Sequence, residues 1–255
     1  MAAHVIVHIP HSSALIPEQE RAGLVIPDDK LKQELLRMTD WYTDQLFNLG
    51  ETAIPVIFPV SRLVCDPERF ANDADEPMAA QGMGAVYTHT SDGRPLRPSL
   101  NAEERQRLLD AYYFPHHQKL EQIVQSALAD HGHCLIIDAH SFPSSPLPCD
   151  RDQSASRPDI CLGTDPFHTP DWLADAAKRA FRDLGWRVEL NRPYPGALVP
   201  LSLYERDARV HSIMVEINRA LYLDETTGER LPHCGKIALR AKSALRTVIA
   251  SFGSV

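Results

Sequence analysis

The chain combines short apolar runs with longer segments in which apolar and polar positions recur at helical spacing. The short runs end at turn-forming residues and predict strands at about residues 4–9, 53–59, 134–140, 157–163, 186–190 and 212–217. The amphipathic segments predict helices at about residues 28–49, 101–130, 169–185 and 233–252. Since strands and helices follow one another in turn, we expect an α/β fold with helices on both faces of a sheet. Two prolines in the 53–59 run predict an edge strand.

Several residues mark the ends and interruptions of the predicted helices. Asn101 and Glu104 fit a capping box at the start of the second helix. Thr169 followed by Pro170 predicts an N-cap and a first helical residue. Pro115 is expected to kink or interrupt the helix that contains it, because proline lacks the backbone N–H.

Composition and charge limit the classes of protein to consider. The 255 residues are 44% hydrophobic and 24% charged, as in globular domains, and we expect residues 1–255 to form one domain without linkers or repeats. A net charge of −8 argues against nucleic-acid or anionic-membrane partners. No apolar run approaches a membrane span or a signal peptide. Five cysteines without CxxC spacing indicate reduced thiols, so we expect a cytoplasmic protein.

Polar side chains follow three of the predicted strands. His11 comes after the first strand, Asp138 and His140 end the strand at 134–140, and Glu216 ends the strand at 212–217. The carboxyl ends of strands in an open α/β sheet are where ligands bind. The two histidines and the glutamate are therefore expected at one site.

This constellation is typical of a metal-dependent hydrolase. Catalytic zinc usually takes three protein ligands and keeps an open position. His11 and His140 supply two of them, and we expect Asp40 to be the third, because it lies among apolar neighbours of its helix and needs a partner. Asp44, one turn further on, is better explained as part of a solvated acidic edge of the helix than as a ligand. Glu216 is then the expected general base, which passes a proton from water to the leaving nitrogen.

Arginines in an acidic chain predict a substrate that carries a carboxylate. Arg62 and Arg69 alternate with apolar residues, and Arg219 follows a predicted strand. A guanidinium binds a carboxylate with two parallel hydrogen bonds. The full set of expected substrate-binding residues is Arg62, Arg69, Arg219, Ser12, Ser141 and Tyr194. The loop at 71–100 is rich in Gly, Pro, Asp and Asn, and loops of this length are often functional.

Five segments, in order over about residues 4–222, resemble the N-formylglutamate amidohydrolase family. They are Ile9-Pro10-His11-Ser12-Ser13, Arg62-Leu63-Val64-Cys65-Asp66-Pro67-Glu68-Arg69, Asp138-Ala139-His140-Ser141, Asn191-Arg192-Pro193-Tyr194-Pro195-Gly196 and Val215-Glu216-Ile217-Asn218-Arg219.

The resemblance implies a single-domain, three-layer α/β/α sandwich with a mixed central sheet, related in fold to zinc carboxypeptidases and aspartoacylase. It also implies a divalent metal, zinc first of all, and hydrolysis of an N-formyl or N-acyl amino acid such as N-formylglutamate. The chain departs from this pattern at two places. Those relatives use a His-x-x-Glu ligand pair, whereas Ala14 is the third residue after His11. Arg192-Pro193-Tyr194 stands where Gly-Asn-Pro-Tyr is expected.

Two other functions remain open at this stage. A serine hydrolase could use Ser12 or Ser141 beside a histidine, although no GxSxG elbow is present. A binding protein could keep the fold without catalysis. For His116 and His117, a surface or supporting role is favoured over direct metal ligation.

Overall fold

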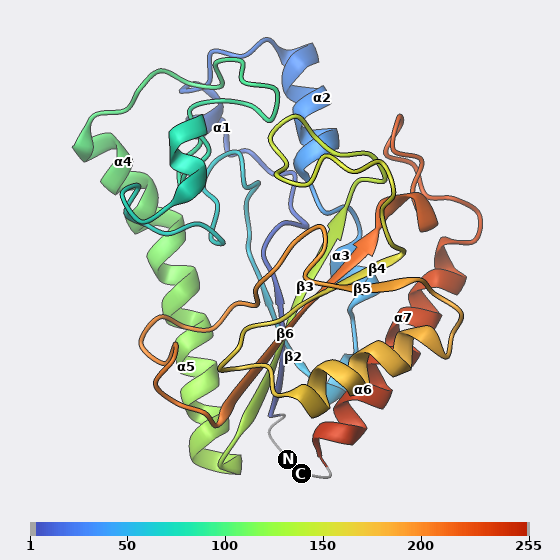
Figure 1. The fold of residues 1–255 in the computed structure, drawn as a ribbon. Coiled ribbons are helices and arrows are strands. Elements are labelled where there is room, and N and C mark those ends of the chain that lie inside the picture. Colours follow the sequence, from blue (N-terminus) through green and yellow to red (C-terminus); the bar gives the residue numbers. More distant parts are fainter. Residues whose placement is uncertain (1–3, 254–255) are drawn as a thin grey trace.

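The computed structural model describes residues 4–253 and contains a mixed sheet of six strands (Figure 1). The strand order is β2-β1-β3-β6-β4-β5, and neighbouring strands are parallel except that β4 is antiparallel to β6. The prediction of an α/β fold with a mixed sheet is confirmed, as is the edge position of β2. The strands are β1 (Val5–Ile9), β2 (Ile54–Ile57), β3 (Cys134–Phe142), β4 (Ile160–Gly163), β5 (Val188–Leu190) and β6 (Val210–Asn218).

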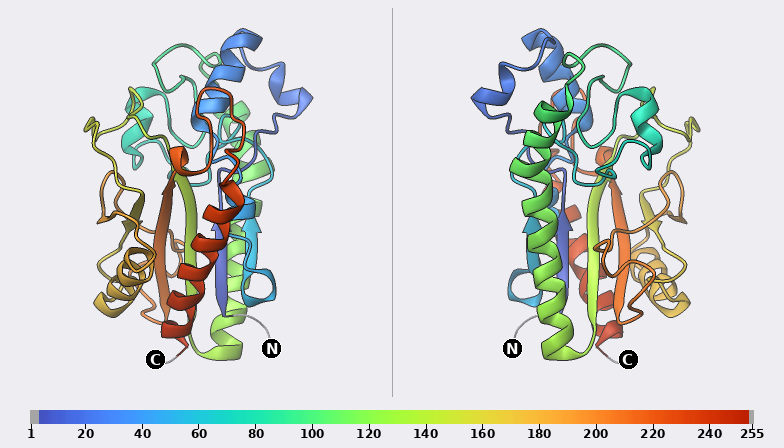
Figure 2. Two further views of the ribbon diagram at one scale, coloured as in Figure 1. Left: turned by 90° about the vertical axis from the view of Figure 1, so that its right-hand side faces the viewer. Right: turned by 90° about the vertical axis from the view of Figure 1, so that its left-hand side faces the viewer.

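Alternate side chains of the central strands enter two apolar clusters on opposite faces. Leu135 and Ile137 of β3 pack in the cluster that contains α3 (Thr43–Leu46), α6 (Asp171–Arg182) and α7 (Cys234–Phe252). Ile136 packs on the other face against Leu120 and Val124 of α5 (Phe114–His131). Figure 2 shows α7 in front of the sheet in one view and α5 in front of it in the opposite view. Helices therefore cover both faces, as the alternation of elements predicts.

Shorter elements gather beyond the carboxyl ends of β1, β3 and β6 (Figure 1). They are α1 (Glu18–Arg21), α2 (Asp28–Met38) and the 3₁₀ turn η2 (Pro77–Gln81). The loop at 71–100 is well packed there, because Met83, Tyr87 and Leu96 join Leu31 and Met38 of α2 in a third apolar cluster. The loop at 71–100 and α2 together cover the carboxyl edge of the sheet.

The predicted helix at 28–49 is wrong in its second half. α2 ends at Met38, Thr39 is extended, and Tyr42 takes a left-handed conformation with φ of 64° before α3 begins. The backbone N–H of Asp40 donates instead to the carbonyl of His11 at 2.9 Å. This conformation of Tyr42 is stabilised by a residue far along the chain, because the Tyr42 hydroxyl donates to the carbonyl of Gly228 at 3.1 Å. Tertiary contacts thus override a locally helical pattern.

The helix expected at 101–130 forms in three consecutive pieces. The capping box of Asn101 and Glu104 opens α4 (Ala102–Leu108) and is confirmed. A π-helical turn, η3 (Leu109–Tyr113), then leads into α5, whose first turn contains Pro115. Proline has no N–H to continue the α-helical hydrogen bonds, and the regular pattern changes just before it. The predicted interruption at Pro115 is therefore confirmed.

The expected cap at Thr169 is wrong, because its hydroxyl donates to the carbonyl of Ser212 at 2.6 Å and α6 begins only at Asp171. Two short 3₁₀ turns complete the description: η1 (Gly50–Thr52) and η4 (Arg219–Leu221). Over residues 4–253, no helix is both long and apolar enough to cross a membrane.

Candidate metal centre and catalytic site

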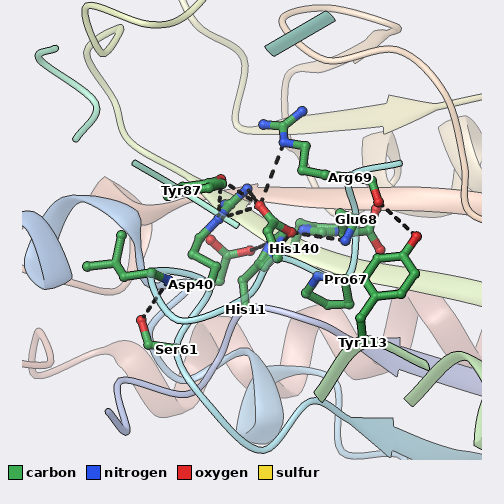
Figure 3. A network of polar contacts seen from close by, with 12 residues as sticks. His11, Asp40, Ser61, Pro67, Glu68, Arg69, Tyr87, Tyr113 and His140 are labelled. Atoms are coloured by element: carbon green, nitrogen blue, oxygen red, sulfur yellow. Dashed lines mark hydrogen bonds and ion pairs between the residues drawn. The ribbon is translucent and has the colours of Figure 1, made fainter. Parts of the chain in front are cut away.

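Three side chains that are distant in the sequence converge at the carboxyl edge of the sheet (Figure 3). His11 follows β1, His140 lies in β3, and Asp40 occupies the break between α2 and α3. Oδ2 of Asp40 is 3.2 Å from Nδ1 of His140 and 3.7 Å from Nδ1 of His11. All three residues are buried, and one donor atom from each lies within 4.8 Å of the others. The three predicted metal ligands are therefore brought together.

The far ring nitrogens of both histidines contact carboxylates. Nε2 of His11 is 2.8 Å from Asp66, and Nε2 of His140 is 3.1 Å from Asp138. Histidines that ligate metals usually engage a carboxylate or carbonyl in this way, which fixes the ring and its tautomer. Nδ1 of His11 is buried and has no hydrogen-bond partner among residues 4–253. Both rings thus present Nδ1 to the space beside Asp40.

Asp40 is held as an ionised carboxylate. Burial alone would raise its pKa, but the nearby imidazoles of His11 and His140 and the charge of Arg219 hold the pKa well below its usual range. Arg219 donates to Oδ1 at 2.8 Å, and the backbone N–H of Ser141 donates to Oδ2 at 3.2 Å. Arg219 also donates to the hydroxyl of Ser141 at 3.2 Å. Arg219 and Ser141, both expected to bind substrate, therefore support the carboxylate of Asp40.

Glu216 lies beside His140, because the two residues pair in register between β6 and β3. His11, Asp40 and His140 line a cavity at this edge of the sheet, and the buried side chain of Glu216 lines it too. Oε2 of Glu216 has no hydrogen-bond partner in the described part of the chain. Burial raises the pKa of Glu216 to about 8, against the opposing charge of His140. A buried carboxyl with a raised pKa and a free oxygen has the properties of a general acid–base group.

The two arginines of the 62–69 segment differ in what they contact. Arg62 donates to Oδ2 of Asp66 through two nitrogens at 3.1 and 2.7 Å, so it supports the partner of His11. Arg69 also lines the cavity, but its guanidinium approaches carboxylates no closer than 3.7 Å at Asp66 and 3.8 Å at Glu76. Its Nε is buried without a hydrogen-bond partner in residues 4–253. Of the pair, Arg69 is free to bind a ligand.

The remaining predicted substrate-binding residues divide between the cavity and its surroundings. Tyr194 lines the cavity, and its hydroxyl is held by Arg157 and Asp150, each at 3.1 Å. Ser12 is not among the cavity-lining residues. Within residues 4–253, neither Ser12 nor Ser141 has a side-chain hydrogen bond to a histidine, so the geometry offers no base for a serine nucleophile.

Sequence reasoning missed a second buried polar group beneath the first. Nδ1 of His8 lies 2.9 Å from Asp138 and 3.2 Å from Glu68, and its Nε2 lies 2.8 Å from His116. Burial lowers the pKa of His8, but hydrogen bonds to Asp138 and Glu68 outweigh it and raise the pKa to about 9. The sequence feature that could have revealed this group is His8 itself, a histidine inside an otherwise apolar strand. His116 takes a supporting place, as predicted.

The mixed sheet carries histidines, buried carboxylates and the unpartnered carboxyl of Glu216 at its carboxyl edge, and these are groups that enzymes of the hydrolase class use. The chain belongs to the N-formylglutamate amidohydrolase family, whose model matches residues 3–223. It is 28% identical over 229 residues to the N-formylglutamate deformylase of Pseudomonas aeruginosa, covering 87% of this chain and 82% of that protein.

Two solved structures share the fold. The N-formylglutamate amidohydrolase of Ralstonia eutropha superposes with a TM-score of 0.84 at 23% identity, over 100% of this chain and 96% of the other. A gene product of Agrobacterium tumefaciens superposes with a TM-score of 0.70 at 19% identity, over 97% and 91% of the two chains. At these identities the likeness establishes the fold alone, and the expected relation to zinc carboxypeptidases stays a prediction.

Proposed function

We propose that the protein is a zinc-dependent amidohydrolase that cleaves the amide bond of an N-formyl or N-acyl amino acid such as N-formylglutamate. The observation that carries the proposal is the convergence of His11, Asp40 and His140 beside the unpartnered carboxyl of Glu216. The family and its N-formylglutamate-cleaving relatives support the substrate class.

The donor set fits zinc or another divalent metal. It consists of two imidazole nitrogens and one carboxylate oxygen, which is the composition common in catalytic zinc sites. The unpartnered Nδ1 of His11 is the atom that such an ion would satisfy. Carboxylates already hold the far sides of both rings. A metal held there supplies a positive charge that acidifies water and polarises a carbonyl oxygen.

The protein's own residues provide the rest of the chemistry. Glu216, facing the same cavity, accepts a proton from water and delivers it to the nitrogen of the leaving amino acid. Arg69 holds the carboxylate of the substrate with its free donors. Arg219 and Ser141 keep Asp40 in place. The burial of these groups strengthens each electrostatic interaction, because water screens them less.

A substrate panel combined with metal removal tests the proposal. N-formyl, N-acetyl and N-carbamoyl derivatives of the same amino acids are supplied to the purified protein, before chelation, after it and after return of zinc. We expect hydrolysis of the N-formyl or another N-acyl series, loss of turnover with the chelator, and recovery with zinc. Turnover that survives complete removal of metal would contradict metal dependence. Bound metal without turnover of any compound would instead favour a binding protein.

A further inference from the structure

Arg69 lines the cavity, whose volume is about 420 Å³, with a guanidinium that makes no hydrogen bond to any residue from 4 to 253. The nearest carboxylate oxygens belong to Asp66 at 3.7 Å and Glu76 at 3.8 Å. Arg62, by contrast, is fixed by a hydrogen bond to Asp66 at 2.7 Å. The position of the Arg69 guanidinium therefore depends on how the backbone of Arg69 is held.

Two side chains from η3 and the start of α5 hold that backbone. The hydroxyl of Tyr113 donates to the carbonyl of Arg69 at 2.9 Å, and Figure 3 shows the guanidinium of Arg69 extending away from this contact. Nε2 of His117 lies 2.8 Å from the carbonyl of Pro67. Burial lowers the pKa of His117, so its ring is neutral. Because a carbonyl oxygen can only accept, Nε2 carries the hydrogen of that ring.

The π-helical turn η3 sets the direction of both side chains. Tyr113 and His117 are four residues apart and share one face of the helix, with ring centres 4.2 Å from each other. Leu108 and Tyr113 are five residues apart, yet both join the apolar cluster that contains Cys65. In an α-helix this spacing would turn the two side chains about 140° apart, whereas an i to i+5 turn aligns them.

We propose that Tyr113 and His117 are positioning residues, which hold residues 67–69 so that the Arg69 guanidinium stays directed into the cavity to meet the substrate. This inference rests on the proposed function, in which Arg69 binds the carboxylate of the substrate. Neither Tyr113 nor His117 lines the cavity, so both act through Arg69. Loss of either hydrogen bond should therefore weaken only the contact that Arg69 makes.

A double-mutant cycle tests this coupling. N-formyl-L-glutamate and its α-amide are assayed with the wild-type protein, Tyr113→Phe, Arg69→Ala and the double variant. We expect Tyr113→Phe to raise KM for the acid by about 3–10-fold, the usual size for one hydrogen bond, with little change in kcat. The α-amide should change by less than about 2-fold, and so should the acid when Arg69 is already alanine.

Tyr112→Phe is the matched control, because it removes the same atom from the neighbouring residue of η3. The Tyr112 hydroxyl donates to Glu20 at 3.1 Å, outside the cavity, so both compounds should keep their wild-type values. His117→Phe is a second variant that keeps a ring beside Tyr113 and removes the Nε2 donor. It should reproduce the effect of Tyr113→Phe. Thermal melting of each variant shows that the fold is retained.

Two results would overturn the inference. One is an equal loss on acid and amide, or a loss that persists beside Arg69→Ala, because either marks a general effect on the fold. The other is unchanged kinetics in both Tyr113→Phe and His117→Phe.

Calorimetry separates this inference from the proposed function. Both compounds are titrated into Glu216→Gln protein, with and without Tyr113→Phe, so that affinity is measured without turnover. A loss of affinity for the acid alone supports the inference, and equal affinities overturn it. If that selective loss is found while the wild-type protein hydrolyses no N-acyl compound, only the proposed function is contradicted.

Discussion

Arg219 donates a 2.8 Å hydrogen bond to Oδ1 of Asp40, while Oδ2 of the same carboxylate faces His11 and His140. The guanidinium of Arg219 is buried and also contacts the hydroxyl and carbonyl of Ser141. Its donors are therefore directed to the protein. This arrangement assigns Arg219 to the support of a metal ligand, where the sequence alone suggests a contact with substrate.

Arg219→Gln should weaken zinc binding by about 10–100-fold, the usual size for a lost partner of a ligand. The reason is that the carboxylate of Asp40 loses the cation that orients it and stabilises its charge. Competition with a chelating dye measures the affinity. Unchanged zinc affinity, with a loss of kcat/KM only for substrates that carry a free carboxylate, would restore Arg219 to substrate binding.

Glu216→Gln should retain stoichiometric zinc and lose about 10²–10⁴-fold in kcat, because the amide cannot carry the proton. Metal analysis and steady-state kinetics on the same preparation give both values. Glu51→Gln, an exposed change in η1, serves as the control and should leave both unaltered. If zinc is lost together with activity, Glu216 is a ligand. Near-normal turnover with a lower melting temperature would make it structural.

Arg69→Ala should lower kcat/KM by about 30-fold or more on an N-formyl amino acid with a free α-carboxylate. The same substitution should matter far less for the α-amide of that compound, which offers no charge at this position. Kinetics with both compounds and both proteins form a double-mutant cycle on one contact. Equal losses on acid and amide would show that Arg69 serves only to stabilise Asp66 and Glu76.

His8 predicts a pH dependence of stability in the metal-free protein. Its pKa is about 9 in the folded chain, above the ordinary value of 6.5, so its contribution is complete below pH 6.5 and disappears as pH rises through 9. We expect the free energy of unfolding to fall by up to about 3 kcal/mol over this interval.

Urea denaturation at pH 6.5 and pH 9.5 measures this change. His8→Gln should lack this part of the decrease, because a neutral side chain then faces Asp138 and Glu68. Parallel decreases in the wild-type protein and the variant would show that His8 is not protonated when buried.

The sheet and its ligand-bearing edge were predictable because the information is local. Apolar runs in β1, β3 and β6 give the strands, and parallel strands deliver His11, His140 and Glu216 to one edge whatever the loops do. Asp40 was correctly predicted to lie beside these residues, although the helix in which it was placed is broken at that position.

The break that places Asp40 could not be predicted from local pattern. No glycine or proline marks residues 39–42, and the left-handed Tyr42 is stabilised by residues almost 190 positions away. The Arg230 guanidinium lies 4.1 Å from the centre of the Tyr42 ring and adds to these contacts. The carboxylate partner of His11 escaped notice for a similar reason. Asp66 lies in a loop, and only the folded chain shows that it contacts His11.

The central claim is that His11, Asp40 and His140 hold one divalent metal, and crystals grown with zinc test it most directly. An anomalous difference map recorded at the zinc absorption edge locates the ion without reference to any assay. We predict one peak per chain, in contact with Nδ1 of His11, Nδ1 of His140 and Oδ2 of Asp40. No peak there, or a single peak among His8, Glu68 and Asp138, would contradict the claim.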